Sequence, residues 1–357
     1  MAACCTMLIL FIAFLYLHNT AIADLAIPTN SHTINQWLLD NTNPMRVELD
    51  AELAEAERNT IVITVNKYGK GDFRNVTDAI NSIPVGNKVR TIIKIAPGIY
   101  HEKLLIDSSK RFVTFYGDPN SMPRISFNGT AKFYTTYNSA TVAVNSDYFM
   151  ASNIIFENTA PRPTPRMEGA QAVAMRISGQ KAAFYNCRFY GYQDTLLDDS
   201  GNHFFKDCFI RGSTDFIFGK AQSIYLNCEL RSDAIGFGVI TAHGRDHKGL
   251  DTGFVFAHCV VNGGGNLFLG RAWRSRSRVV FAYTYLPSNL NPKGWDDMGF
   301  PWHQRTVFYG EYKCMGPGAV TNQRVNYSRV LTDRQARHFL DLNFIHASTW
   351  LLPPPKL

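Results

Sequence analysis

The stretch "HFFKDCFI", residues 203–210, joins a run rich in aromatic residues to one Asn, Asp or His, here Asp207, and a cysteine. The same pattern recurs in "AAFYNCRF" (182–189), "SIYLNCEL" (223–230) and "GFVFAHCVV" (253–261). Aligned on their cysteines, the four segments are separated by steps of 21, 20 and 31 residues. A period near 20 residues, with longer steps where loops are inserted, is typical of the coils of a solenoid.

The flanking sequence favours the same architecture. "FMASNIIFEN" (149–158) and "VVFAYTYL" (279–286) share the pattern without the cysteine, and short β-branched and aromatic runs begin at "IVITV" (61–65). We therefore predict an all-β, right-handed parallel β-helix in which strands stack about 4.8 Å apart and aligned residues form ladders. A β-sandwich, which also contains many short strands, is the alternative.

Helices are expected only at the two ends of this domain. "NVTDAINSIP" (75–84) predicts a short N-terminal helix with Asn75 as its N-cap and Pro84 after its end. "LTDRQARHFLDLNFI" (331–345) predicts a C-terminal helical tail that begins with a capping box and packs on the side of the solenoid. "AELAEAER" (51–58) is also helix-prone, but the sequence offers it no evident partner.

The N-terminus has the pattern of a secretory signal peptide. "TMLILFIAFLYL" (6–17) is an apolar run, and "AIA" (21–23) supplies small residues for cleavage. A membrane anchor is the alternative, although the run is short for a bilayer. We predict a signal peptide at 1–23, a leader or surface arm at 24–58, the β-helix catalytic domain at 59–352 and a tail at 353–357.

Charge and cysteine content restrict the partners and the redox state. The signal segment has no charged residue, so the formal net charge of +7 belongs to the mature chain, which will tend to accumulate at polyanions. Secretion favours an acidic polysaccharide over nucleic acid or a membrane. Five cysteines remain after cleavage, an odd number; a disulfide between Cys208 and Cys228 stays open. Asn75, Asn128 and Asn326 lie in N-x-[ST] sequons, which suit a secreted glycoprotein.

Two acids occupy positions that the repeat makes equivalent. Asp194 follows Cys187 by seven residues, and Asp215 follows Cys208 by seven. If the cysteines are aligned, the carboxylates lie on neighbouring coils, within one or two strand spacings. Two such carboxylates repel, so one tends to hold a proton while the other stays ionised, which supplies an acid and a base or nucleophile together. The alternative is that both are turn aspartates that cap backbone N–H groups.

Basic, aromatic and amide residues accompany these acids. An arginine near Asp215, such as Arg271 in "GNLFLGRAWRS" (265–275), would keep the carboxylate charged. Trp273 and Trp295 offer flat apolar faces to a sugar ring. A solvated arginine and packed tryptophans are the alternative for these three residues.

Gln171 and Gln193 are neutral donors of the kind that can bind an oxyanion, or else ordinary hydrogen-bonded glutamines on a coil.

Several common sites are excluded. The sequence contains no G-x-S-x-G nucleophile elbow, and no C-x-x-C pair suggests a metal site. "YGKGDFR" (68–74) has an arginine at the third glycine position of a dinucleotide loop. The basic cluster "RAWRSRSR" (271–278) is interpreted as a solvated face near an anionic ligand rather than a nucleic-acid site.

Taken together, the motifs resemble those of the plant pectin methylesterases (pectinesterases). Five blocks match in order: "GIYHEK" (98–103), "QAVAM" (171–175), "GYQDTL" (191–196), "DFIFG" (215–219) and "LGRAW" (269–273). The likeness covers roughly residues 60–352 and is to the form that lacks the large N-terminal inhibitory domain, because only about 35 residues precede the core.

This resemblance implies an ester hydrolase that removes methyl groups from cell-wall polygalacturonate without metal or cofactor. By motif, Asp215 would be the nucleophile and Asp194 the general acid and then base. Gln171 and Gln193 would form the oxyanion hole, Arg271 would hold Asp215, and Trp273 and Trp295 would line the sugar groove. We expect a secreted monomer of the cell wall whose partner is the pectin chain; a proteinaceous inhibitor is a further partner that the resemblance allows.

Three positions depart from the family pattern. Ala272 replaces the usual proline of "LGRAW", which is expected to loosen the strand that presents Arg271 and Trp273. Leu197 replaces a tyrosine that contacts substrate in many members, and Met175 replaces leucine. None of these removes a catalytic group, so we expect activity with altered substrate preference.

Two other kinds of protein are alternatives: a different β-helix enzyme that acts on the same polymer, and a protein that binds the polymer without catalysis. A pectate lyase would need clustered acidic calcium ligands, and a polygalacturonase would need acids set for glycosidic cleavage. A catalytically silent wall-binding protein would use only the positive charge and the groove. The motif blocks match neither other enzyme, and intact Asp194, Asp215 and Arg271 argue against the silent protein.

Overall fold

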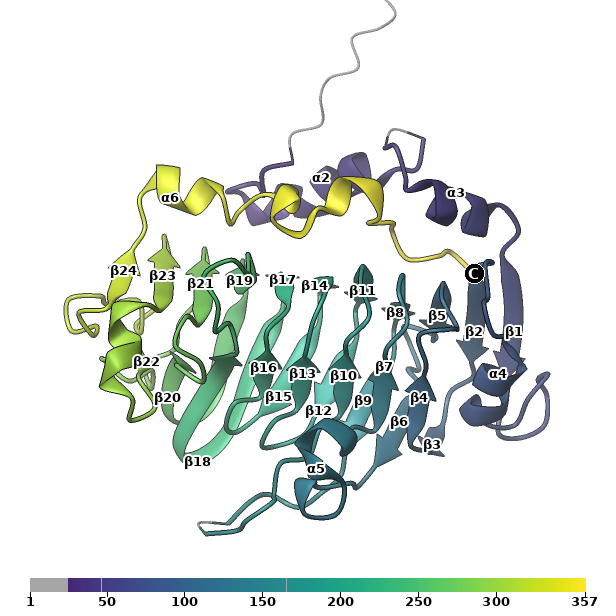
Figure 1. The fold of residues 1–357 in the computed structure, drawn as a ribbon, viewed down its shortest axis with the longest axis horizontal. Coiled ribbons are helices and arrows are strands. Elements are labelled where there is room, and N and C mark those ends of the chain that lie inside the picture. The colour runs from purple at the N-terminus through teal and green to yellow at the C-terminus, as the bar shows by residue number, and fades with distance from the viewer. Residues whose placement is uncertain (1–24, 46, 165) are drawn as a thin grey trace, which may run out of the picture.

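The computed structural model describes residues 25–45, 47–164 and 166–357. The predicted signal peptide at 1–23 lies outside the described residues. The chain winds into a right-handed parallel β-helix, as predicted, and every pairing between its strands is parallel in the part described. Figure 1 shows the strands of successive coils side by side along the solenoid.

Each complete coil supplies one strand to a first sheet and two strands to a second, bent sheet. The first sheet contains β1 (Ile61–Val65), β2 (Thr91–Ile95), β5 (Val113–Tyr116), β8 (Met150–Ser152), β11 (Ala182–Tyr185), β14 (Asn202–Lys206), β17 (Gln222–Leu226), β19 (Gly253–Ala257), β21 (Arg278–Ala282), β23 (Phe308–Tyr312) and β24 (Ser328–Val330).

The second sheet consists of two lines of short strands that meet at a long one. One line is β3 (Ile99–His101), β6 (Arg124–Phe127), β9 (Ile155–Asn158), β12 (Arg188–Tyr190) and β15 (Phe209–Gly212); the other is β4 (Leu104–Ile106), β7 (Val142–Val144), β10 (Met175–Ile177), β13 (Leu196–Asp198) and β16 (Ile217–Gly219). Both pair with β18 (Glu229–His243), which is followed by β20 (Val260–Arg271) and β22 (Trp295–Asp296). We call the line from β4 to β16, with the C-terminal halves of β18 and β20 and with β22, the site face.

A ladder of stacked rings fills the interior and fixes the register between coils. Phe184 stacks on Phe205 with ring centroids 4.7 Å apart, Phe205 on Tyr225 at 4.5 Å, and Tyr225 on Phe256 at 4.5 Å. These spacings match the distance between hydrogen-bonded strands, so each aromatic ring packs on its equivalent in the next coil. The predicted ladder is therefore confirmed.

The residue before each cysteine makes the sharp turn from the first sheet to the second. Asn186, Asp207, Asn227 and His258 all have a left-handed backbone, with φ between 48° and 56°. Asn, Asp and His are the non-glycine residues that tolerate this conformation best. The next residue then points inward, which explains the repeated order of aromatic strand, polar residue and cysteine.

The cysteines form a second internal ladder. Cys187, Cys208, Cys228 and Cys259 are buried, and all five cysteines of the described chain, Cys314 included, are free thiols. The structure thus contains no disulfide between Cys208 and Cys228. Thiols this apolar and this deeply buried pack as small hydrophobic groups.

The helices α2 (Ile34–Thr42), α3 (Ala51–Arg58) and α6 (Asp333–Arg337) cover the outer surface of the first sheet. They lie along one side of the solenoid, whereas α5 (Ala131–Asn138) lies on the opposite side (Figure 1). α4 (Val76–Ser82) packs against β1, β2 and β4. The remaining short helices are of the 3-10 type: η1 (Ser31–Thr33), η2 (Pro301–Arg305), η3 (Leu342–Ile345) and η4 (Ala347–Thr349).

Both predicted caps are present. The side chain of Asn75 accepts a hydrogen bond from the backbone N–H of Asp78 and begins α4. Thr332 and Gln335 form the reciprocal capping box of α6, although that helix ends at Arg337 and the tail continues as 3-10 turns.

The stretch 51–58, which seemed to lack a partner, packs against the sheet. Leu53 and Ala56 of α3 are fully buried in a hydrophobic cluster with outward-facing residues of the first sheet, among them Phe204 and Ile224. Trp350 of the C-terminal tail belongs to the same cluster. The sequence hid this partner because the outward face of a parallel strand, when covered, is as apolar as the inward face.

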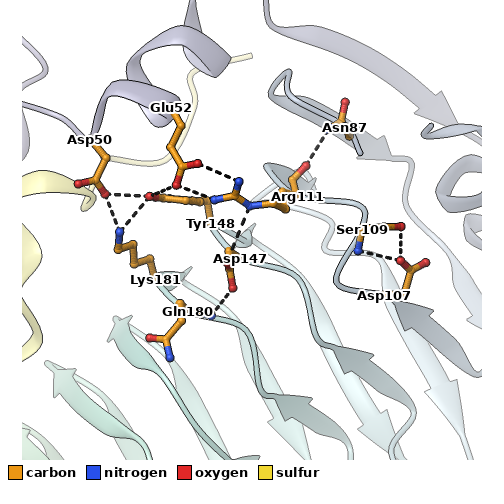
Figure 2. Close-up of polar contacts among 10 residues, drawn as sticks. All are labelled: Asp50, Glu52, Asn87, Asp107, Ser109, Arg111, Asp147, Tyr148, Gln180 and Lys181. Atoms are coloured by element: carbon orange, nitrogen blue, oxygen red, sulfur yellow. Dashed lines mark hydrogen bonds and ion pairs between the residues drawn. The ribbon is translucent and has the colours of Figure 1, made fainter. Parts of the chain in front are cut away.

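Polar contacts also fasten α3 to the coils, as Figure 2 shows. The hydroxyl of Tyr148 donates toward Asp50 and Glu52, at 2.9 and 2.8 Å, and Lys181 Nζ donates to Asp50 at 2.8 Å. Arg111 forms a two-pronged pair with Glu52, with N–O distances of 2.9 and 2.6 Å. We call these five residues the α3 latch.

Candidate active site

Asp194 and Asp215 lie at equivalent positions of neighbouring coils on the site face, as the 21-residue step predicts. Gln193 bridges to Thr214, and the backbone N–H of Asp194 donates to Thr214 O at 3.1 Å. Each aspartate lies two positions before the first residue of a strand, β13 or β16, and each has a left-handed backbone, with φ of 64° and 48°. The conformation is one that aspartate adopts more readily than most residues, so the turn positions suit these side chains.

Both carboxylates are almost sealed from solvent. Asp194 is 8% exposed and Asp215 is 7% exposed. Arg271, at the end of β20, donates from Nε to the two carboxylate oxygens of Asp215 at 2.8 and 3.1 Å, and its Nη2 donates to Oδ2 as well. A bidentate guanidinium orients a carboxylate and favours its charged form.

The surroundings separate the protonation states of the two acids. Burial and the neighbouring charge of Asp215 raise the pKa of Asp194 well above its usual range. Burial also raises the pKa of Asp215, but the charge and the hydrogen bonds of Arg271 oppose that rise. The surroundings of Asp194 therefore favour its protonated form, whereas the guanidinium beside Asp215 favours the charged form of that carboxyl.

Gln171 and Gln193 lie next to this pair. Gln193 precedes Asp194 in the chain, and its backbone oxygen accepts a hydrogen bond from Ala172 N–H at 3.1 Å, which joins the Gln171 segment to the coil of Asp194. Both side chains are half-buried.

The two tryptophans have different environments. Trp273 is half-buried, with its ring edge-on to Phe218 at 6.0 Å and packed on Gly244, where an added Cβ would lie 2.8 Å from the ring. Trp295 is only 1% exposed and stacks flat on Tyr309 at 4.2 Å. The prediction that Trp295 lines a sugar groove is not supported, because its ring faces are occupied inside the solenoid.

The structure shows the surroundings of the three residues that depart from the family pattern. The N–H of Ala272 donates to Asp296 O at 3.0 Å, a hydrogen bond that proline could not make. This hydrogen bond joins the end of β20 to the next coil, which is the opposite of the loosening expected from the sequence. Leu197 pairs with Phe218 across β13 and β16, and Phe218 pairs with Ala242 of β18. These three residues form an apolar floor against which Trp273 packs.

Met175 is fully buried in the interior, where it pairs with Leu196, so its exchange for leucine affects packing alone.

Sequence reasoning missed Asp296. It pairs with Arg271 across β20 and β22, and its charge acts on both Arg271 and Asp215. The only available signal was its position after Trp295 in "GWDD", because the 25-residue step from Arg271 does not match the period of the other coils.

The described residues show neither a candidate metal site nor a candidate membrane span. They contain no group of three or more His, Cys, Asp or Glu side chains that could hold a metal ion. None of their helices combines the length and the apolar character that a membrane crossing requires.

Comparison with known proteins identifies the family. The family model named Pectinesterase matches residues 62–348. The Arabidopsis thaliana protein named "Putative pectinesterase 63" is 49% identical over 331 residues, which cover 92% of this chain and 91% of the relative.

Solved structures of similar proteins point to the same family. The pectin methylesterase from carrot has 32% sequence identity and a TM-score of 0.73 over 78% of this chain and 90% of its own. A pectin methylesterase in complex with a hexasaccharide has 26% identity and a TM-score of 0.71 over 83% of this chain and 100% of its own. The parallel β-helix, the two buried aspartates and this likeness along nearly the whole chain lead to one conclusion: the protein belongs to the pectinesterase family.

Proposed function

We propose that this pectinesterase hydrolyses the methyl esters of cell-wall homogalacturonan, releasing methanol and pectate, with Asp215 as the nucleophile and Asp194 as the acid and base. The observation that carries the proposal is the buried pair of carboxylates on neighbouring coils, of which only Asp215 is held by Arg271. One ionised and one protonated carboxyl side by side can supply the nucleophile and the general acid of an ester hydrolysis.

The first half of the reaction forms a covalent intermediate. A carboxylate oxygen of Asp215 attacks the ester carbonyl carbon, and the side-chain amides of Gln171 and Gln193 donate hydrogen bonds to the oxyanion that develops. The intermediate collapses with cleavage of the bond to the methoxy oxygen. Asp194 gives its proton to that oxygen, so methanol leaves and the galacturonyl group remains bound to Asp215 as an anhydride.

The second half regenerates the enzyme. Ionised Asp194 takes a proton from water, and the resulting hydroxide attacks the galacturonyl carbonyl. The bond to Asp215 breaks, the product leaves as a free carboxylic acid, and Asp194 is again protonated. Arg271 keeps Asp215 oriented for both steps.

The apolar surface of the site suits the methyl ester and the sugar ring, and the positive net charge suits the acidic polymer. The floor of Leu197, Phe218 and Ala242, with Trp273 beside it, offers contact for a methyl ester and a sugar ring. The net charge of +7 attracts the acidic polymer. The hexasaccharide complex of a similar enzyme supports a saccharide chain as ligand. We assign the protein to the extracellular cell wall, as a monomer active in cell wall modification and pectin breakdown.

Replacing the nucleophile tests this proposal. Asp215→Asn should abolish methanol release from highly methylated pectin while binding to pectin survives, since the shape of the site is kept. Asp207→Asn is the matched control, because Asp207 also has a left-handed backbone on the same coil and the equivalent position of its neighbours is asparagine. Wild-type turnover by Asp215→Asn would refute the assignment, and chain shortening or unsaturated ends would indicate a glycosidase or a lyase.

A further inference from the structure

A carboxylate and a histidine are buried together beside the site face. Asp198 is the last residue of β13, and His203 is the second residue of β14, on the same coil. Both side chains are fully buried, and neither takes part in the proposed reaction. Ionisable groups buried this completely destabilise a fold unless they are paired, so both need partners inside the solenoid.

The structure supplies these partners. His203 Nδ1 contacts Asp198 Oδ1, and His203 Nε2 lies 2.7 Å from the backbone oxygen of Gly179. The hydroxyl of Tyr225, a member of the interior aromatic ladder, donates to Asp198 Oδ2 at 2.7 Å. Burial and the charge of Asp198 raise the pKa of Tyr225 well above its usual range, so this hydroxyl keeps its proton.

The types of these partners determine where the protons lie. A backbone carbonyl oxygen only accepts, so Nε2 of His203 carries a hydrogen. A second proton must lie between Nδ1 and Oδ1, because two lone pairs at hydrogen-bond distance would repel each other. Asp198 accepts on both of its oxygens, which favours the charged form of a carboxyl group. An imidazolium that donates from both nitrogens to a carboxylate and a carbonyl satisfies every one of these contacts.

A glycine makes room for the histidine. Gly201 has a φ of 117°, and an added Cβ there would lie 2.7 Å from His203 Nε2 and 2.6 Å from Gly179 O. A side chain at this position would therefore displace the ring or the carbonyl group that accepts from it. The turn between β13 and β14 is thus shaped around the His203 contact.

The backbone of Asp198 also contacts the coil that carries Asp215. Gly219 is the last residue of β16, and an added Cβ there would lie 1.9 Å from Asp198 O. Ala221 N–H donates to the same oxygen at 3.2 Å. Asp198 ends the short strand that follows Asp194, and Gly219 ends the short strand that follows Asp215. One buried residue therefore adjoins the ends of both strands.

We propose that Asp198 and His203 form a buried ionic pair that positions β13 and β16. These strands in turn fix the places of Asp194 and Asp215, so the inference rests on the proposed function, in which those two acids react. Strands of three residues depend on contacts at their ends, since they make few hydrogen bonds of their own. A displacement of about 1 Å in a reacting group can lower the rate about 100-fold, so a contact at the far end of such a strand affects turnover.

The protonation of His203 can be observed in the wild-type protein, without any variant that has to fold. NMR of protein labelled with ¹⁵N-histidine should show a proton on both ring nitrogens of His203 at neutral pH, and His203→Gln assigns these signals by their loss. His243 is the internal reference for a neutral ring, because burial lowers its pKa to about 3. A single protonated nitrogen on His203 would overturn the ionic pair.

Kinetics test the positioning role. Asp198→Asn and His203→Gln should each lower kcat about tenfold or more at a temperature well below Tm, with KM changed less than about twofold. The double variant should lose no more than the more severe single variant, because the two side chains act as a unit.

His258→Asn is the matched control. His258 is also buried and its Nε2 also contacts a backbone oxygen, that of Pro28 at 2.7 Å, but it lies at the other corner of the coil, where Asn227 is the equivalent residue. This variant should keep the kcat of wild type.

The outcomes separate this inference from the proposed function. Variants of the pair that have a lower Tm but the kcat of wild type, or losses of kcat that simply add in the double variant, would refute the positioning role. A wild-type protein that releases no methanol from any pectin would refute the proposed function, whereas two protons on the His203 ring of that protein would still establish the ionic pair.

Discussion

Asp194 and Asp215 share residue type, backbone conformation and burial, and they differ mainly in their neighbours. Arg271 reaches Asp215 from two coils away, since Phe218 pairs with Ala242 and Ala242 with Arg271. Sequence spacing predicted that the two acids would be equivalent, but it could not predict which of them the arginine contacts. That choice depends on side-chain reach across the sheet, and only the family resemblance indicated it in advance.

At the residue scale, the pH profile of activity should depend on Arg271. In the proposed mechanism Asp215 must be ionised and Asp194 protonated, so kcat/KM should rise with pH through the pKa of Asp215 and fall as Asp194 loses its proton. Arg271→Gln removes the charge that lowers the pKa of Asp215, so the acid limb of the profile should move upward by about 1–3 pH units.

Arg305→Gln, which changes an exposed arginine, should leave that limb in place. An unchanged limb in Arg271→Gln would show that the contact does not tune the nucleophile.

Stability offers a second test at the residue scale. The pKa of Asp194 is higher in the folded state than in the unfolded state. The contribution of Asp194 to the free energy of unfolding is therefore fully present below the unfolded-state pKa and is lost as pH rises through the folded-state pKa. Asp194→Asn removes a carboxyl whose ionised form burial disfavours, so we expect Tm to rise by about 2–4 °C near pH 8 with little change near pH 4. Thermal unfolding at the two pH values measures this; a lower Tm at both would contradict it.

At the scale of strands and helices, some elements can be predicted from sequence patterns and others cannot. The aromatic strands of the first sheet were predictable because their 20-residue period is explicit, and the caps at Asn75 and Thr332 were predictable because they depend on local chemistry. The strands of the site face were harder to predict, since β13 and β16 are only three residues long. Strands this short have no periodicity of their own and form because the neighbouring coils supply hydrogen-bond partners.

The docking of α3 yields a prediction at this scale. Arg111 and Tyr148 lower the pKa of Glu52 from 4.5 to about 2. The contribution of Glu52 to stability is therefore present above pH 4.5 and disappears as pH falls toward about 2. Because the Glu52 side chain is 49% exposed, Glu52→Gln should cost no more than about 1 kcal/mol near pH 7, and less in acid.

Urea denaturation of the Glu52 variant at neutral and acid pH measures the effect. The control is Glu55→Gln, on the same helix, whose only ion pair is the exposed one with Arg58 in the described chain. If the two variants unfold alike, the α3 latch does not hold the helix.

The whole molecule is a stack in which each coil depends on its neighbours. Phe205 is fully buried and stacked between Phe184 and Tyr225. Phe205→Ala opens a cavity in the middle of the ladder, and we expect a loss of about 3–5 kcal/mol in the free energy of unfolding, measured by chemical denaturation. Phe237→Ala, at a residue 48% exposed, should cost far less. Similar losses at both positions would argue against the ladder as the main source of register.

The left-handed turns that hold the two acids have an evolutionary consequence. Asparagine fits such a backbone as readily as aspartate does, and Asn186 and Asn227 already occupy comparable corners of this chain. One base change in an aspartate codon could therefore erase hydrolysis and spare the architecture. We expect related proteins that bind polysaccharide without hydrolysing it to arise easily from this fold. Such proteins would have asparagine in place of one of the two aspartates, in a turn whose backbone is otherwise unchanged.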